Sequence, residues 1–455
     1  MKVKCTSVAF FIVSFLAFFT FAWSEEIPKV WTLAEAVKWA LKESRLTAYA
    51  RFGVEGAEAQ KKGAFSHFLP QLSTYYQYTY LHPEPWSYMP PVSLSSNTPP
   101  LVLTSPGGAI TVGTQNNYSW AIEAKQPIFA GGAIKANYEA RKKGLDIARL
   151  DEQSTIVNLA ADVKGAYFQV LKAEKMVELA QVALEQIKSH HRDAESFFAV
   201  GLIPKNDLLE AEVRLAVAMQ HLIQAENALE VARSQFNTLL RRPINAPVRL
   251  KDRLEFQPFE KSMEHCMRKA LENRPELRAY RLRVEQARDM VKVAKGELFP
   301  SLSLIGHYER YGDEADLRGT TFRSMENWYV AARVDWAFWE WGRTKYEVDA
   351  RRAQENQILN LWEAERDRVI LEVKTAFLKV KEAEKQVWVA KKAIEQAEEN
   401  FRLNRERYRE QLATSTDVLD AQGLLTKTKS DYVAALSDYF IYQAQLERAI
   451  GEMSP

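Results

Sequence analysis

A stretch of sequence that occurs twice decides the fold. Residues 40–70 read ALKESRLTAYARFGVEGAEAQKKGAFSHFLP, and residues 270–300 read ALENRPELRAYRLRVEQARDMVKVAKGELFP. The two stretches align at a shift of 230 positions, which places Pro70 on Pro300. A match at a fixed spacing indicates an internal duplication, so we expect two copies of one structural unit.

The later part of each copy aligns at a different shift. GLIPKNDLLEAE, which starts at Gly201, aligns with QLATSTDVLDAQ, which starts at Gln411, at a shift of 210 positions. The shift falls by 20 because one connection within the first copy is longer than its counterpart in the second. We therefore expect a first repeat over residues 25–243, an inter-repeat linker in the equatorial region over 244–262, and a second repeat over 263–455.

Apolar residues in both copies alternate three and four positions apart, which is typical of coiled-coil helices. Residues 134–200 contain no proline and only two glycines, and a single helix of that length reaches roughly 100 Å. We interpret the apolar seams as core, and His191, which falls on one seam, as a packed histidine. The pattern predicts four coiled-coil helices, over about 133–200, 204–241, 343–410 and 415–450.

Four shorter stretches alternate with a period of two residues, which is the period of β-strands. One face of each stretch is apolar or aromatic, and the opposite face carries residues such as Glu123, His307 and Arg333. The connection over 82–113 holds seven of the 17 prolines, and the one over 312–327 is short and polar, so we expect irregular, exposed, extracellular loops. The predicted strands cover about 71–81, 114–126, 301–311 and 328–338.

Aromatic residues gather at the ends of these strands, as in the girdles of membrane-spanning strands. A soluble hairpin would show the same alternation, but four of the 11 tryptophans lie within 14 positions, which favours an interfacial belt. Four strands cannot close a barrel alone, so copies of the chain must share one, and both eight and twelve strands remain open. The predicted belt consists of Tyr78, Tyr80, Tyr118, Trp120, Trp328, Trp336, Trp339 and Trp341.

The N-terminus has the pattern of a secretory signal peptide. Lys2 and Lys4 precede an uncharged apolar stretch over 8–23, and small residues lead to a predicted cleavage after Ser24, so residues 1–24 form the leader. A membrane anchor is the alternative. Without the leader, 59 basic residues balance 59 acidic ones, which leaves no surplus for nucleic acid, and Cys266 is the one remaining cysteine.

The duplicated helix-strand-strand-helix unit resembles the TolC-like outer membrane efflux protein family. The resemblance rests on FLP before a hairpin, QPIFAGG after it, and the turn sequences VGLIPKNDLLEAE and STDVLDAQ, in order along the chain. It implies a mainly α fold with membrane β-structure: a homotrimeric 12-stranded β-barrel in the outer membrane lipid, continued by a long α-helical barrel through the periplasm. It also implies a periplasmic adaptor (membrane fusion protein) and an inner-membrane transporter as partners.

The same resemblance implies residues for a periplasmic gate. Asp417 and Asp420 match a motif that places carboxylate rings in the lumen, and a spacing of three puts both on one helix face. Capping of the returning helix is the alternative role for Asp417. Tyr408 and Asp207 match positions of the network that latches neighbouring hairpins. Ala413 replaces an arginine expected nearby, and we interpret the three arginines Arg405, Arg407 and Arg409 as a solvated face.

The helical turns match the family's docking tips for adaptor hairpins. Val200, Gly201 and Leu202 match the first tip, whereas Gln411 and Leu412 form a second tip that lacks the glycine.

Residue types for catalysis or metal binding show no suitable arrangement. Only His190 and His191 among the seven histidines are adjacent, and neighbours on a helix point about 100° apart, which makes a poor metal pair. We therefore expect no enzyme activity, no cofactor and no metal. The leading hypothesis is a passive outer membrane channel of a tripartite efflux or type I secretion system, and the alternative is a periplasmic coiled-coil adaptor or scaffold.

Overall fold

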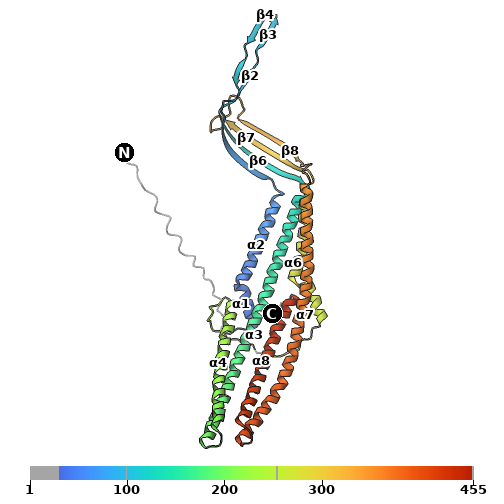
Figure 1. The fold of residues 1–455 in the computed structure, drawn as a ribbon. Coiled ribbons are helices and arrows are strands. Elements are labelled where there is room, and N and C mark those ends of the chain that lie inside the picture. The colour runs from blue at the N-terminus through green and yellow to red at the C-terminus, as the bar shows by residue number, and fades with distance from the viewer. Residues whose placement is uncertain (1–29, 99, 253–254, 453–455) are drawn as a thin grey trace, which may run out of the picture.

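The computed structural model describes residues 30–98, 100–252 and 255–452. The predicted leader over 1–24 lies outside the described residues. Long helices run side by side in the lower part of the molecule, a small curved sheet lies above them, and a narrow two-stranded projection extends from the sheet (Figure 1).

The eight helices of the described residues repeat one pattern of lengths. Each half contains a helix of 11 residues, one of 22, one of 67 and one of 35 or 36. Among the described residues, no helix is both long enough and apolar enough to cross a membrane. The first half contributes α1 (Leu33–Glu43), α2 (Arg45–Ser66), α3 (Ala133–Ala199) and α4 (Lys205–Leu239), and the second half α5 (Met263–Asn273), α6 (Pro275–Gly296), α7 (Arg343–Arg409) and α8 (Ser415–Ile450).

Two equivalent apolar cores hold the helices together. In the first half, α3 packs on α4 around Tyr167 and Phe236, and in the second half α7 packs on α8 around Val380 and Tyr439. The Tyr167 hydroxyl donates hydrogen bonds to the Trp31 carbonyl oxygen at 3.0 Å and to Asp252 at 2.7 Å. α3 also contacts α6 and α8, so the two halves form one continuous helical layer.

A buried network of charged side chains joins both halves near the middle of the helices. The guanidinium group of Arg274, which is 2% exposed, donates to Glu276 at 3.2 Å and to Glu372 at 2.6 Å. Arg448 of α8 also donates to Glu372, and to Asn158 of α3 at 3.2 Å. Burial acts to raise the pKa of Glu276, but hydrogen bonds from Ser154 and Arg274 outweigh burial and lower it. The network thus ties α3, α6, α7 and α8 through paired charges.

The central sheet has four antiparallel strands in the order β1-β6-β7-β8, so the pair β6 and β7 joins the two halves. Directly paired residues of an antiparallel sheet share a face. Ile122 pairs with Thr74 on one side and Tyr308 on the other, and Tyr308 pairs with Trp328. The register therefore confirms one apolar face across all four strands. The strands are β1 (Gln71–Tyr80), β6 (Asn116–Ala130), β7 (Ser301–Gly312) and β8 (Glu326–Asp335).

Glycines allow the tight passage from strand to helix. Gly131 and Gly132 have φ values of 58° and 82°, in the left-handed region, and α3 begins immediately after them. A Cβ atom on Gly131 would lie 2.1 Å from the carbonyl oxygen of Gly296, at the end of α6. The paired glycines of the FAGG sequence therefore let this turn approach the neighbouring helix closely.

The connection over 82–113 differs from the irregular loop predicted for it. It contains four short strands that pair as β2 with β5 and β3 with β4, and these form the narrow projection in Figure 1. The described prolines of this connection lie between the strands or at the first position of one, where proline is tolerated. The prediction of an irregular loop was therefore wrong. The strands are β2 (Trp86–Met89), β3 (Val92–Asn97), β4 (Pro100–Ser105) and β5 (Gly108–Thr111).

Loss of Arg274 should destabilise the helical layer. Arg274→Ala leaves Glu276 and Glu372 with less compensation in a buried site, so we expect a loss of about 3–5 kcal/mol in the free energy of unfolding. Arg281→Ala is the matched control on the same helix, because that side chain is 77% exposed, and its effect should stay within about 0.5 kcal/mol. Thermal unfolding followed by circular dichroism measures both changes. Equal midpoints for the two variants would contradict a structural role for the network.

Candidate functional site

The two helical turns lie together at the end of the molecule furthest from the sheet (Figure 1). In the first turn, the amide of Leu202 donates to the carbonyl oxygen of Phe197 at 2.9 Å, and in the second the amide of Leu412 donates to Arg407 at 2.7 Å. Gly201 and Gln411 both have left-handed backbones, with φ values of 74° and 62°. The two turns thus close in the same way, although a glutamine at this position carries a strain that glycine avoids.

Apolar side chains project from these turns. Val200 and Leu202 on the first turn and Leu412 on the second are exposed. Isolated exposed apolar residues are ordinary, but here they stand at equivalent places on two adjacent tips. The structure therefore places all five predicted tip residues on the same surface.

Asp417 caps the first turn of α8. Its carboxylate accepts hydrogen bonds from the Thr414 amide at 2.8 Å and the Thr414 hydroxyl at 2.7 Å, and the Thr414 hydroxyl accepts from the Asp417 amide at 3.2 Å. This reciprocal arrangement is a capping box. The side-chain and backbone hydrogen bonds from Thr414 lower the pKa of Asp417. Capping, the alternative role predicted for Asp417, is thus present.

Asp420 has a different partner. The Arg214 guanidinium group, on α4, lies 3.4 Å from the Asp420 carboxylate and 3.8 Å from Glu210. Thr416 of α8 donates to Glu210 at 3.1 Å, so two polar contacts connect α4 with α8 beside the turns. Sequence reasoning missed Arg214, although one signal was available. The residue that aligns with Arg214 in the second repeat is Leu424, so the two repeats differ in charge at this position near the tip.

The resemblance assigned Tyr408 and Asp207 to one latch between neighbouring hairpins, and this role stays a prediction. Tyr408 is buried, its ring lies 5.0 Å from the ring of His190 and 5.6 Å from that of Phe197, and its hydroxyl hydrogen has no acceptor among the described residues. Asp207 lies in the first turn of α4. Burial is the main cause that raises the pKa of Tyr408, and the charge of Asp207 contributes.

A buried histidine joins the two hairpins near the tip. The Nε2 atom of His190, on α3, lies 2.8 Å from the Ser415 hydroxyl at the start of α8. Burial lowers the pKa of His190, so the ring is neutral at pH 7. The His191 side chain is 15% exposed and lies 3.6 Å from Glu195, so His191 is largely packed, as predicted, and His190 is buried more deeply.

The predicted solvated face agrees with the contacts of the nearby arginines. Arg405, Arg407 and Arg409 are exposed, and none of them forms an ion pair with a described carboxylate. No group of three or more histidines, cysteines or acids within the described ranges is placed to hold a metal ion.

The aromatic belt residues divide between the two ends of the sheet. The ring of Tyr78 lies at a tilt against that of Tyr118, with centroids 4.7 Å apart, and the ring of Trp120 lies 6.2 Å from that of Tyr308, both far from the helices. Trp328 and Tyr80 lie at the same end. Trp336, Trp339 and Trp341 follow β8 at its helical end, because the strand stops at Asp335 and not at 338. Trp328 and Trp336 are eight residues apart, roughly 27 Å along a strand, which is close to the height of a lipid-facing band.

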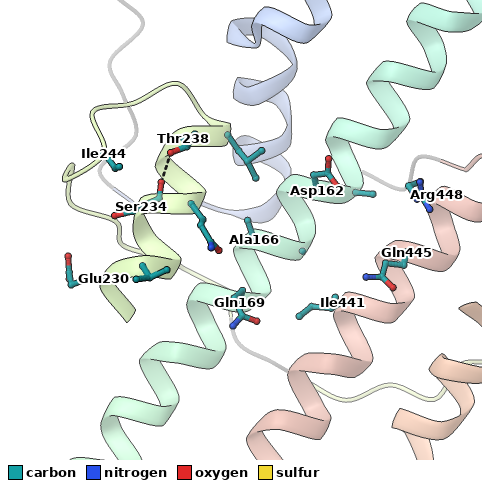
Figure 2. Close-up of a pocket in the computed structure, with 15 residues that line it drawn as sticks. Asp162, Ala166, Gln169, Glu230, Ser234, Thr238, Ile244, Ile441, Gln445 and Arg448 are labelled. Atoms are coloured by element: carbon teal, nitrogen blue, oxygen red, sulfur yellow. Dashed lines mark hydrogen bonds between the residues drawn. The ribbon is translucent and has the colours of Figure 1, made fainter. Parts of the chain in front are cut away.

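A cavity of about 1110 Å³ lies near the middle of the helices. Figure 2 shows Ala166 and Gln169 of α3 facing Ser234 of α4 on one side and Gln445 of α8 on the other. Partial burial raises the pKa of Asp162 at its wall, and the charge of Arg448 opposes this. None of the described buried polar atoms that lack a partner belongs to a residue lining this cavity, so we regard it as a gap where α4 and α8 pack on α3 from two sides.

Comparisons with known proteins agree with this architecture. The model of the family described as outer membrane efflux protein matches residues 36–240 and 266–452. Nodulation protein T of Rhizobium leguminosarum bv. trifolii is 22% identical over 322 residues, which cover 70% of this chain and 68% of that protein. Outer membrane protein TolC of Vibrio cholerae is 24% identical over 312 residues, or 66% and 69% of the two chains. The crystal structure of the Campylobacter jejuni CmeC outer membrane channel has a TM-score of 0.77 at 18% identity and covers 92% of this chain and 85% of that one, which shows a shared fold.

The start of α8 should lose protection from hydrogen exchange in acid. The pKa of Asp417 is lowered from 3.8 in the folded chain. The stability that its carboxylate gives to the first turn of α8 is therefore present above that pH and is lost as the pH falls below about 3.8. Mass spectrometry at several pH values, corrected for intrinsic exchange, should show this loss over residues 414–420, and Asp417→Asn should remove the pH dependence. Asp207→Asn, in the first turn of α4, is the matched control and should leave residues 414–420 unchanged. An unaltered profile in Asp417→Asn would contradict the assignment.

Proposed function

The chain belongs to the outer membrane efflux protein family, and from this premise we propose that it is the outer membrane channel of a tripartite efflux or type I secretion system. In this proposal it conducts substrates passively across the periplasm and the outer membrane, while an inner-membrane transporter supplies the energy and selects the cargo. The observation that carries the proposal is a four-stranded sheet, apolar on one face and open at both edges, that continues into two helices of 67 residues each.

The open edges support an assembly of three chains. β1 and β8 each have a neighbour on one side within the chain, so the other side lacks ladder partners. Unpaired backbone groups are very costly in lipid, and barrels avoid them by closing. Eight or twelve strands satisfy this requirement, and the family resemblance favours twelve, from a homotrimer. The apolar face would then contact outer membrane lipid, with the aromatic belt at its two borders.

The two tips support contact with a periplasmic adaptor. Val200, Leu202 and Leu412 offer apolar side chains at the end of the helical layer, furthest from the membrane strands. An adaptor hairpin with an apolar stripe is a suitable partner for such a surface. The equal backbone geometry of the two turns means that the missing glycine in the second tip does not change its shape.

The acidic residues beside the tips support a gate. In a homotrimer, Asp417 and Asp420 would gather six carboxylates about one axis, which would attract cations. Asp417 would act as a cap as well as a ring residue. The contact between Asp420 and Arg214 would hold α8 against α4 in the resting state.

A periplasmic adaptor or scaffold is the competing function, and cell fractionation with gel electrophoresis separates the two. We expect the protein in the outer membrane fraction and, on unboiled gels, in a band at three times the mass of the boiled chain. Shared strand hydrogen bonds in a closed barrel account for resistance to detergent and moderate heat. A protein released into the soluble periplasmic fraction as a monomer would contradict the channel.

Removal of the contact between Asp420 and Arg214 should ease opening of the tip. We expect Asp420→Ala and Arg214→Ala each to raise single-channel conductance in planar bilayers, because each removes the same contact between α4 and α8. The double variant should exceed the single variants only slightly, since coupled residues do not contribute additively. Asp431→Ala, an exposed acid further along α8, is the matched control. Conductance equal to the unmodified channel in both single variants would remove Asp420 from the gate.

A further inference from the structure

A second cavity lies between α3, α7 and α8, close to the tips, with a volume of about 420 Å³. Its wall includes Ile187 of α3, Phe401 of α7 and Leu419 of α8, so most of its surface is apolar or aromatic. Cavities of roughly 300–1,000 Å³ with such walls and a few polar groups are typical sites for small molecules. Both hairpins of one chain therefore line one enclosed space.

Two polar atoms in this wall lack partners. The hydroxyl hydrogen of Tyr408 has no acceptor and the side-chain oxygen of Gln422 has no donor among the described residues, although Ser415 acts on the Tyr408 oxygen and opposes the rise that burial causes in its pKa. The two residues are only 5% and 4% exposed. Both residues line the cavity. Nearly all buried polar groups in folded proteins have a partner, so a donor and an acceptor left unpaired in one cavity indicate a missing one.

Neighbouring contacts hold these two atoms in place. The amide nitrogen of Gln422 donates to the side-chain oxygen of Gln186 and to the Thr426 hydroxyl, at 3.2 Å for the latter, which fixes the amide and leaves its oxygen free. His190 already contacts Ser415 through its Nε2 atom. The ring of Tyr408 is packed between His190 and Phe197. The polar groups are therefore preorganised, which is a property of binding sites.

The charges that line the cavity favour an anion at its rim. Arg405 and Arg409 are exposed and form no ion pair with a described residue. Glu185 is neutralised by Lys188 at 2.8 Å, so Asp193 is the one lining acid without a basic partner at salt-bridge distance. Two arginines against one carboxylate leave a net positive rim, and guanidinium groups bind carboxylates well.

We propose that this cavity binds a small hydroxylated aromatic carboxylate. The ring lies against Phe401, Ile187 and Leu419, and the carboxylate meets Arg405 and Arg409 at the rim. Ring hydroxyl groups accept a hydrogen bond from Tyr408 and donate one to the oxygen of Gln422, which satisfies both unpaired atoms. A bound molecule contacts α3 from one hairpin and α7 and α8 from the other, so it joins the two hairpins above the tip. This site lies between helices of a single chain and goes beyond the proposed conduction.

Binding of 6-hydroxy-2-naphthoate to the purified full chain tests the proposal. Isothermal titration in nanodiscs, with empty nanodiscs as the blank, should give saturable binding at one site per chain. Tyr408→Phe keeps the packed ring and loses only the hydroxyl, so we expect binding about five- to tenfold weaker. Tyr442→Phe makes the same change elsewhere, on α8, and is the matched control with unchanged binding. Arg405→Gln combined with Arg409→Gln should weaken binding a few-fold and reduce its dependence on salt.

A second probe shows whether Tyr408→Phe weakens binding because a hydrogen bond is lost or because the cavity loses its structure. 2-Naphthoate lacks the hydroxyl and loses the hydrogen bonds to both Tyr408 and Gln422, so it should bind the unmodified chain more weakly than Tyr408→Phe binds the hydroxylated probe. Tyr408→Phe should not weaken binding of 2-naphthoate further. Gln422→Met provides an independent variant that removes the other polar atom and should also weaken binding of the hydroxylated probe. No saturable binding at 1 mM, or equal binding of the two probes by the unmodified chain, would overturn the proposal. Neither measurement depends on conductance, so a failed channel test and a failed binding test are distinguishable.

Discussion

Backbone groups on the outer sides of β1 and β8 have no strand beside them in the part of the chain that the structure describes. The face of the same sheet that carries Ile122, Tyr308 and Trp328 is apolar and aromatic. An apolar face is stable in lipid, whereas an open sheet edge in lipid leaves each backbone group without a partner. A single copy cannot meet both conditions. In the proposed assembly, further copies meet both conditions together by pairing edge to edge.

Edge pairing would also determine where the long helices lie. β6 passes into α3 through Gly131 and Gly132, and a short connection ending at Gly342 leads from β8 into α7. Because these connections are short, strands arranged around an axis would bring the helices round the same axis. The charged network around Arg274 and Glu372 then keeps α3, α6, α7 and α8 in one layer. Paired buried charges require good geometry from every member, so this network restricts how the two halves can shift near the middle of the molecule.

Periodic features of the sequence predicted much of the fold, but they could not predict contacts between residues that are far apart in the sequence. Spacing of three and four located the helices, alternation located the four main strands, and the register confirmed their apolar face. The pairing of Arg214 with Asp420 joins residues 206 positions apart, and no local pattern carries such information. The latch role that the resemblance gives Tyr408 and Asp207 stays a prediction, and within one chain the ring of Tyr408 packs against His190 and Phe197. The short strands over 82–113 were missed because seven prolines suggested a loop, although these prolines lie outside the strand interiors.

Strain and unsatisfied polar groups are concentrated near the tips. Gln411 adopts a left-handed backbone, Tyr408 and Gln422 hold unpaired buried atoms, and the contact between Arg214 and Asp420 is exposed to solvent. Near the middle of the helices, by contrast, Arg274 is buried and pairs with the carboxylates of Glu276 and Glu372. Local opening requires less free energy where few interactions are satisfied and more where many are. The helical layer is therefore more stable near its middle than near the tips. This is the distribution of stability expected for a layer that stays intact while its tips move.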